Sequence, residues 1–354
     1  MNISPELQSI INVLKYKINL PKSPVLQNKI NEKRWYELIH DNELSAFIGS
    51  DALPYTSNLL LNDYIRSGYS AFSREIEANR ILNLLPNPIL LKGSALIKTL
   101  YTEPPHRQMS DIDLIFHSND DAYRAIDILK EKGFIFSGTG QKQGHHHFPP
   151  LVNKINELIF EIHTNLSTPP LEDKLMNYIL NKRTKKIRNN MEILDPVFLT
   201  IHHSIHATAD IIDAPLLRNI FEVAWLVSKL HLFEKCELER ILKEFDIVDR
   251  AEPALFLAHK LFGTSFLGEP KNKKIINLAL QRLEWTRSDM LKFSKWDKLK
   301  IDYKISSSAL TMAKKLITDK LEKETQNNIK SIKVGDYTLA HDIDTGCVHL
   351  LGEE

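Results

Sequence analysis

Hydrophobic positions repeat with helical spacing along the first quarter of the chain. Leu7, Ile10 and Leu14 form one apolar stripe, and Ser4 followed by Pro5 is a typical helix start, with a hydroxyl cap and a proline in the first turn. The same spacing predicts two further helices, at about 32–47 and 55–84, the second stopped by Pro86. We expect residues 1–85 to form a helical packing layer and not a site.

Between residues 86 and 194 the pattern changes to short apolar runs separated by helical segments. The runs predict strands at about 89–92, 111–116, 134–136, 157–163 and 191–194. Helices are expected at about 94–100 and 120–131, with Gly133 closing the second. This alternation indicates an α+β fold in which helices flank a mixed sheet.

From Asp195 onwards the pattern is helical again, and Asp195-Pro196 is another cap and first-turn pair. Further helices are predicted at about 215–231, 234–246, 250–262, 272–283 and 287–325. Two short strands, 331–339 and 347–351, are expected about a turn at 342–346. The predicted organisation is an N-terminal helical segment, an α/β core, a helical domain and a terminal hairpin, at 1–85, 86–194, 195–330 and 331–354.

Two aspartates in the predicted strand 111–116 carry the strongest chemical signal. Residues i and i+2 of a strand point to the same face, so Asp111 and Asp113 project side by side while Ile112 and Leu114 enter the core. Two close carboxylates repel each other unless a cation lies between them, and Mg²⁺ is a hard ion that prefers oxygen ligands. The pair therefore predicts a metal site.

A glycine and a serine separate the first strand of the core from its helix. The backbone N–H groups and the positive end of the helix at Gly93-Ser94 suit a phosphate, and Ser94 adds a hydroxyl. Lys92 either reaches a phosphate or ends the strand. The alternative for Gly93-Ser94 is a plain turn in which Ser94 caps the helix.

These motifs together resemble the signature of the nucleotidyltransferase superfamily typified by DNA polymerase β. The residues that carry the resemblance, which extends over roughly 60–260, are Leu91-Lys92-Gly93-Ser94-Ala95-Leu96, Tyr101, Arg107 and Ser110-Asp111-Ile112-Asp113-Leu114. More narrowly, they are similar to a bacterial branch known as nucleotidyltransferase family proteins. The resemblance implies a nucleotidyltransferase-type mixed sheet and transfer of NMP from an NTP to an acceptor hydroxyl of a small molecule, peptide or protein, with release of pyrophosphate. It also implies dependence on Mg²⁺ or Mn²⁺.

Two-metal phosphoryl chemistry needs a third carboxylate, usually on a neighbouring strand. Glu161 is our choice, because the resemblance implies an acidic residue on a later strand, and the narrower branch has a similar Glu-x-His there. His163 shares its face and is assigned to nucleotide binding. Glu157 is the competing carboxylate, and the alternative for Glu161 is a strand residue that faces water.

Basic residues supply further candidates for nucleotide binding. Arg107 is expected either to neutralise the triphosphate or to pair with an aspartate, since a guanidinium suits both. The resemblance implies that His206 and Arg218 line the nucleotide or acceptor side of the cleft. Arg218 and Glu222 resemble an Arg–Asp pair of the narrower branch, with Glu in place of Asp.

Three other polar groups are interpreted as structural. His202, His206 and Asp210 share one helical face, which a zinc site would also require, but helix-packing histidines are favoured. For 145–147, three histidines in a glycine-rich loop, a polar rim is favoured over metal or substrate binding. For the basic run 182–188, a charged strand edge is favoured over binding to RNA or a phosphorylated acceptor.

Composition excludes several classes of protein. A chain of 354 residues with 43% hydrophobic and 26% charged residues is typical of a soluble globular protein of two or three domains. The net charge of +1 gives no field that attracts nucleic acid, so a nucleic-acid partner is not favoured. Cys236 and Cys347 alone make neither a disulfide framework nor a cysteine-rich zinc site.

The compartment is expected to be the cytoplasm. The N-terminus lacks the features of a secretory signal, and no apolar run approaches the ~20 residues that span a bilayer. Neither a membrane nor a membrane anchor is therefore predicted as a partner.

Two alternative functions remain open at this point. The first is a toxin-like nucleotidyltransferase that acts on tRNA or protein, and the second is a catalytically silent module that binds a nucleotide or a partner. A third interpretation concerns only the C-terminus, where residues 334–353 resemble strands of small peptide-carrier domains. The acceptor, the base of the NTP and the oligomeric state are not predicted.

Overall fold

The fold is known from a computed structural model, in which the chain divides into two units, residues 1–290 and 291–354. Each unit is described by itself. The described residues are 3–21, 30–49, 57–101, 103, 106–137, 147–155, 157–167, 170–188, 190–211, 216–265, 273–286, 331–334, 337–341 and 348–351.

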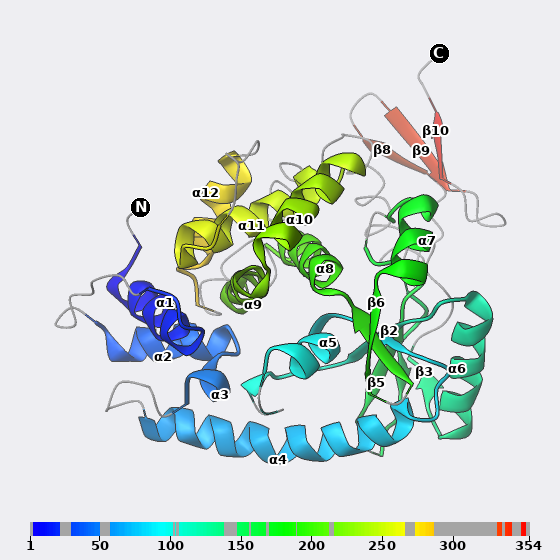
Figure 1. Ribbon diagram of the computed structural model, residues 1–354, viewed down its shortest axis with the longest axis horizontal. Coiled ribbons are helices and arrows are strands. Elements are labelled where there is room, and N and C mark those ends of the chain that lie inside the picture. The colour runs from blue at the N-terminus through cyan, green and yellow to red at the C-terminus, as the bar shows by residue number, and fades with distance from the viewer. Residues whose placement is uncertain are drawn as a thin grey trace. The chain divides into compact units, whose positions relative to one another are not determined.

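A seven-stranded mixed sheet organises the first unit (Figure 1). Its strands are β1 Ile89–Leu90, β2 Ile112–Ile115, β3 Ile135–Phe136, β4 Leu151–Val152, β5 Ile159–Ile162, β6 Thr184–Arg188 and β7 Met191–Leu194. Their order is β3-β4-β5-β2-β1-β7-β6, with β2 parallel to β5 and antiparallel to β1, which in turn runs parallel to β7. The predicted α+β architecture with a mixed sheet is confirmed.

The N-terminal helices are α1 Pro5–Lys17, α2 Glu32–Asp41, α3 Ser45–Ile48 and α4 Ser57–Leu82. Ser4 caps α1 as predicted, since its Oγ accepts from Leu7 N at 3.2 Å. The single helix predicted over 32–47 is wrong. The chain leaves the helix after Asp41, because Glu43 adopts a left-handed φ of +54°, and α3 begins only at Ser45.

Two helices of the core follow β1 and β2. α5 spans Lys92–Thr99 and begins earlier than predicted, so Gly93 and Ser94 lie in its first turn. α6 spans Asn119–Glu131, and Gly133 follows it with a φ of +85°, as the predicted helix stop requires.

The remaining helices are α7 Asp173–Lys182, α8 Pro196–Ala209, α9 Leu216–Lys229, α10 Leu232–Glu244, α11 Val248–Phe262 and α12 Lys273–Arg282. α7 and β4 were not predicted, and the helix predicted at 287–325 lies outside the described residues. The basic run 182–188 ends α7 and forms β6, an edge strand, which confirms its interpretation as a charged strand edge.

Helices surround the sheet unevenly in Figure 1, where the long α4 runs beneath α3 and α5 and helices α8 to α11 gather above α5. An aromatic cluster joins these layers: the ring of Phe47 in α3 lies 5.4 Å from Tyr101 and 5.3 Å from Phe221 of α9. Edge-to-face and tilted pairs of this kind contribute about 0.5–1.5 kcal/mol each beyond burial. The cluster fixes the end of α5 against α9.

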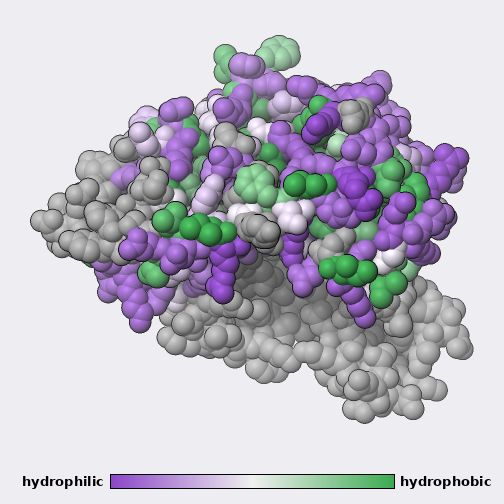
Figure 2. All heavy atoms as spheres, turned by 90° about the horizontal axis from the view of Figure 1, so that it is seen from below, coloured by the Kyte–Doolittle hydropathy of each residue, from purple (hydrophilic) through white to green (hydrophobic). Residues whose placement is uncertain are grey.

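The outer face of α4 is turned to solvent. Figure 2 views this side and shows separate hydrophobic residues on a largely hydrophilic surface. Five apolar residues of α4 are at least 47% exposed, namely Leu59, Leu61, Ile65, Phe72 and Ile76. Within the described ranges, no helix combines the length and the apolar character needed to span a membrane.

The second unit contains a three-stranded antiparallel sheet of β8 Ser331–Val334, β9 Tyr337–His341 and β10 Val348–Leu351, in the order β10-β9-β8. The single strand predicted over 331–339 is therefore wrong, because β8 and β9 pair with each other across 335–336. The predicted turn at 342–346 lies outside the described residues.

Candidate active site

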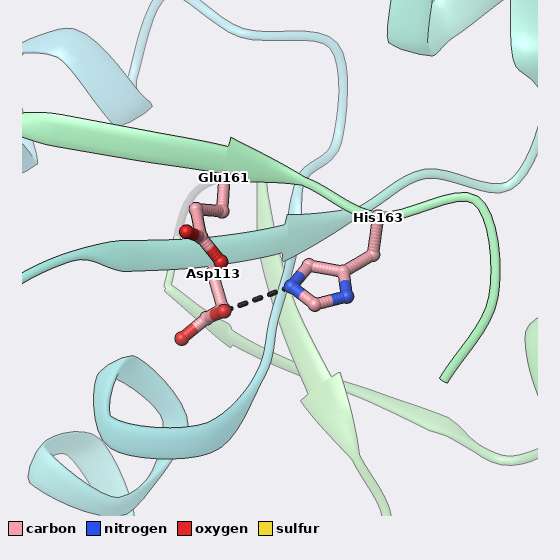
Figure 3. Close-up of side chains that lie close together, drawn as sticks. All are labelled: Asp113, Glu161 and His163. Atoms are coloured by element: carbon pink, nitrogen blue, oxygen red, sulfur yellow. Dashed lines mark hydrogen bonds and ion pairs between the residues drawn. The ribbon is translucent and has the colours of Figure 1, made fainter. Parts of the chain in front are cut away.

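Two neighbouring strands bring an aspartate, a glutamate and a histidine together (Figure 3). Asp113 on β2 lies directly opposite Glu161 on β5, and His163 follows the end of β5, where its N–H donates to Leu114 O at 2.7 Å. One potential ligand atom from each of the three side chains lies within 4.8 Å of the others. Oxygen and imidazole donors at this spacing are able to hold a divalent metal ion.

Asp113 is the most enclosed member of this cluster, at 2% exposure. His163 Nε2 lies 2.8 Å from its Oδ1, and Lys92 Nζ lies at the same distance from that oxygen. Burial opposes ionisation, but the hydrogen bond from His163 and the charge of Lys92 hold the pKa of Asp113 well below its usual range. Lys92 adopts a left-handed φ of +41° at this place in the chain.

The pKa values of the other two predicted metal ligands are shifted upward, in the opposite direction to that of Asp113. Burial, followed by the charge of Asp113, raises the pKa of Asp111 and also that of Glu161. The three carboxylates therefore repel one another, with Lys92 as a partial counter-charge, although Asp111 lies outside the group of ligand atoms formed by Asp113, Glu161 and His163. A bound divalent cation would relieve this repulsion, so the donor set fits a metal ion.

The first turn of α5 lies next to the carboxylates, because Leu91 N donates to Asp113 O at 3.0 Å. The N–H groups in the first turn of a helix have no acceptor within the helix. Ser94 Oγ is buried and has no hydrogen-bond partner among the described residues. A phosphate oxygen would satisfy both kinds of donor, as the sequence predicted for Gly93-Ser94.

Gly93 also has a steric role that the sequence did not indicate. The guanidinium of Arg107 packs against its Cα, so a side chain at position 93 would overlap Nη1 of Arg107. The glycine therefore allows an arginine to approach the helix start, in addition to any approach by phosphate.

Arg107 does not pair with either aspartate. Its Nε donates to Glu222 Oε1 at 2.7 Å and its Nη2 to Oε2 at 3.3 Å, and Tyr101 Oη donates to the same carboxylate at 2.7 Å. His203 Nε2 lies 3.1 Å from Oε2. Burial opposes ionisation of Glu222, but Arg107 and His203 hold its pKa well below the usual range. The expected pairing of Arg107 with an aspartate is wrong.

Sequence reasoning missed Glu222 as the partner of Arg107. The signal that was present is an acid within the apolar helical run 220–227, since a charge at a buried helix position needs a partner. Arg218, which was compared with Glu222 as a pair, forms its ion pair with Glu43 instead.

The histidines of α8 have separate environments. His206 Nε2 lies 3.2 Å from Asp210, whereas His202 is buried and neither of its ring nitrogens has a hydrogen-bond partner in the described chain. Among the described residues, His202, His206 and Asp210 do not form a group that is able to hold a metal. This agrees with the packing interpretation of the α8 histidines.

Two further predicted residues lie near the rim of the site. His147 forms a bridge to His163, with the two rings 5.5 Å apart, while 145 and 146 lie outside the described residues. Glu157 is exposed and pairs with Arg74 of α4 at 3.4 Å, so it lies away from the carboxylate cluster.

A cavity of about 310 Å³ lies beside Asp111. It is enclosed by α4, by α5 at Ile97, by the segment 107–112 and by residues 157–159. Helix α4 supplies one wall of this cavity, and the expectation that the N-terminal helices form a packing layer and not a site stays a prediction.

A family of proteins described as uncharacterised nucleotidyltransferases matches residues 42–263. The match covers the carboxylate cluster, the first turn of α5 and Glu222. No curated protein and no solved structure matches the chain significantly.

Proposed function

The chain belongs to the family of uncharacterised nucleotidyltransferases, and on this premise we propose that it transfers a nucleoside monophosphate from an NTP to an acceptor hydroxyl. The observation that carries the proposal is the placement of Asp113 and Glu161 opposite each other on parallel strands, next to the first turn of α5. Asp111 lies directly before β2, two residues from Asp113. This arrangement joins a metal site to a phosphate site.

The phosphates of the NTP lie over the start of α5 in this proposal. The N–H groups of the first turn and the Ser94 hydroxyl donate to phosphate oxygens, since these are donors without partners inside the helix. Arg107 adds a guanidinium that Glu222 holds against Gly93, with Nη1 turned to the helix start. Its positive charge stabilises the pyrophosphate that leaves.

The reaction forms one bond and breaks another. The acceptor oxygen attacks the α-phosphorus, the bond from that phosphorus to the bridging oxygen breaks, and pyrophosphate departs. The hydroxyl proton passes to Asp111, the carboxylate that lines the cavity. Asp111, Asp113 and Glu161 would hold Mg²⁺ or Mn²⁺, and the ion would lower the pKa of the hydroxyl and neutralise phosphate charge.

His163 has a positioning role. Burial lowers its pKa, although Asp113 counteracts this effect, so a neutral ring donates one N–H to Asp113. That hydrogen bond fixes the orientation of the carboxylate, as outer partners do at metal sites. His206 and Arg218 remain proposals for the acceptor side, and their observed partners are Asp210 and Glu43.

Calorimetry and intact-mass measurement test the proposal. The wild type is expected to bind Mn²⁺ and an NTP, to release pyrophosphate, and to add one nucleotide mass to a component of a fractionated lysate. Asp113→Asn is expected to lose these properties. Asp120→Asn, an exposed change in the first turn of α6, is the matched control and should retain them.

Each outcome separates the alternatives. A nucleotide adduct that persists in Asp113→Asn contradicts the assigned site. Binding of an NTP without pyrophosphate release in any fraction indicates a silent module. An adduct on tRNA or protein, with growth arrest on expression, identifies the toxin-like function.

A further inference from the structure

We propose that the cavity beside Asp111 binds the acceptor, and that the acceptor is a small hydroxyl compound with a carboxylate or phosphate group at its other end. The inference rests on the proposed function, because it assigns the second substrate of the same site.

The volume of the cavity and its apolar lining are typical of a small-molecule site. Its volume of about 310 Å³ lies at the lower end of the usual range for ligand pockets. The floor is apolar and buried, formed by Ala78, Ile97, Ile112 and Leu158, whose exposure is 8% or less. Asp111 lines one part of the wall, so a ligand in the cavity reaches the carboxylate cluster.

The acidic residues contributed by α4 already have partners. Asp63 accepts from Tyr36 Oη at 3.0 Å and lies 3.2 Å from His40. Glu75 forms an ion pair with Lys98 and accepts from Asn79 at 3.0 Å. These carboxylates therefore attract a ligand cation only weakly.

The arginines contributed by α4 are less well compensated. Arg66 is exposed and has no ion pair within 4.0 Å in the described part of the chain. Arg74 makes two contacts of 3.4 Å, to Met109 O and to Glu157, a carboxylate with 80% exposure. Arg107 also lines the cavity, but two of its nitrogens donate to Glu222 and its Nη1 is turned to the start of α5, where the proposed function places the NTP.

The cavity thus has spare positive charge on its α4 wall, an apolar floor and a carboxylate at the reaction centre. Guanidinium groups bind carboxylates and phosphates in the same forked geometry. A ligand that fits places its anion at Arg66 and Arg74 and its hydroxyl at Asp111. Such a ligand leaves the first turn of α5 to the NTP.

Calorimetry on the full chain without nucleotide and metal tests this assignment. The probes are glycerol 3-phosphate and glycerate, which carry hydroxyl and anion, and glycerol as the neutral counterpart. The wild type is expected to bind at least one anion more tightly than glycerol. The double variant Arg66→Ala with Arg74→Ala should weaken that binding by about tenfold or more, the loss typical of a removed charged contact.

Arg80→Ala is the matched control. Arg80 lies on the same helix, pairs with Glu77 at 2.7 Å and does not line the cavity, so its removal should leave anion binding unchanged. Comparison of the anions identifies which group the arginines recognise. Thermal unfolding of each variant verifies that the fold is retained.

Three results overturn the inference: neither anion binds, glycerol binds as tightly as the anions, or the double variant equals the wild type. The proposed function is judged separately by Mg²⁺-dependent binding of an NTP. Anion binding that depends on the arginines, without NTP binding, refutes the proposed function while the cavity assignment stands. NTP binding without arginine-dependent anion binding refutes the cavity assignment alone.

Discussion

Replacement of Glu222 by glutamine tests how strongly the helical part of the molecule holds the candidate active site. The change removes one negative charge and leaves Arg107, which is 7% exposed, without its counter-ion. The amide is also unable to accept from Tyr101, Arg107 and His203 together as the carboxylate does.

The magnitude follows from the burial of the pair. Removal of one partner of a buried ion pair costs about 3–5 kcal/mol, because the remaining charge loses its compensation. The amide retains part of the hydrogen bonding, so we expect a loss of about 3 kcal/mol in the free energy of unfolding. For a unit of 290 residues, that corresponds to a fall of roughly 5 °C in Tm.

Urea denaturation and a thermal scan measure the effect, with Glu244→Gln as control. Glu244 pairs with Arg240 on an exposed helix face, so its replacement should change stability by less than about 0.5 kcal/mol. If Glu222→Gln behaves like this control, the pair does not stabilise the fold and the reasoning fails.

The same variant has a pH signature. The pKa of Glu222 lies below its ordinary value in the folded state, so its contribution is complete above the unfolded pKa of about 4.3 and is lost as pH falls further. The difference in the free energy of unfolding between wild type and variant should stay constant from neutral pH down to about 4.3 and then become smaller. A difference that grows on acidification contradicts the assignment.

Three further predictions concern the site and its surroundings. The pKa values of Asp111 and Glu161 are raised, so protons should compete with Mn²⁺ at a higher pH than they do at ordinary carboxylates. Calorimetry should show that the affinity for Mn²⁺ falls on acidification, and an affinity that does not depend on pH contradicts this. Gly93→Ala should lower the free energy of unfolding by about 1–3 kcal/mol through overpacking, and it should weaken NTP binding. Gly263 has a left-handed φ and open space around it, so Gly263→Ala should lower stability only through backbone strain and leave NTP binding intact. His202→Leu should stabilise the protein by about 1–3 kcal/mol in urea denaturation, since it removes two buried nitrogens without partners; a loss of stability contradicts this.

Features encoded by neighbouring residues were predicted from the sequence. Strand β7 has the predicted bounds, and Asp195 Oδ1 accepts from Phe198 N at 2.9 Å as the cap of α8. Caps, strand periodicity and the register of Asp113 depend on residues a few positions apart, so the local pattern contains the information. The family resemblance added that these strands form a nucleotidyltransferase-type mixed sheet.

Features that depend on distant residues were not predictable in the same way. Arg107 and Glu222 are 115 positions apart, and the apolar run around Glu222 indicates that this acid needs a partner without indicating that the partner is Arg107. The break between α2 and α3 arises because Glu43 adopts a left-handed backbone conformation. In this conformation its carboxylate forms an ion pair with Arg218. The cavity beside Asp111 forms between α4 and the segment 107–112, which are distant in the sequence, so no local pattern predicts it.

The backbone of Lys92 is strained at the position whose side chain compensates the carboxylate cluster. A φ of +41° costs a residue with a side chain of order 1–3 kcal/mol, a strain that glycine avoids. Lys92→Gly would also remove the ammonium group 2.8 Å from the buried Asp113. Loss of one partner of a buried ion pair costs about 3–5 kcal/mol, more than the strain that glycine relieves. Selection for heat resistance should therefore retain this lysine in spite of its unfavourable backbone conformation, just as selection for turnover should.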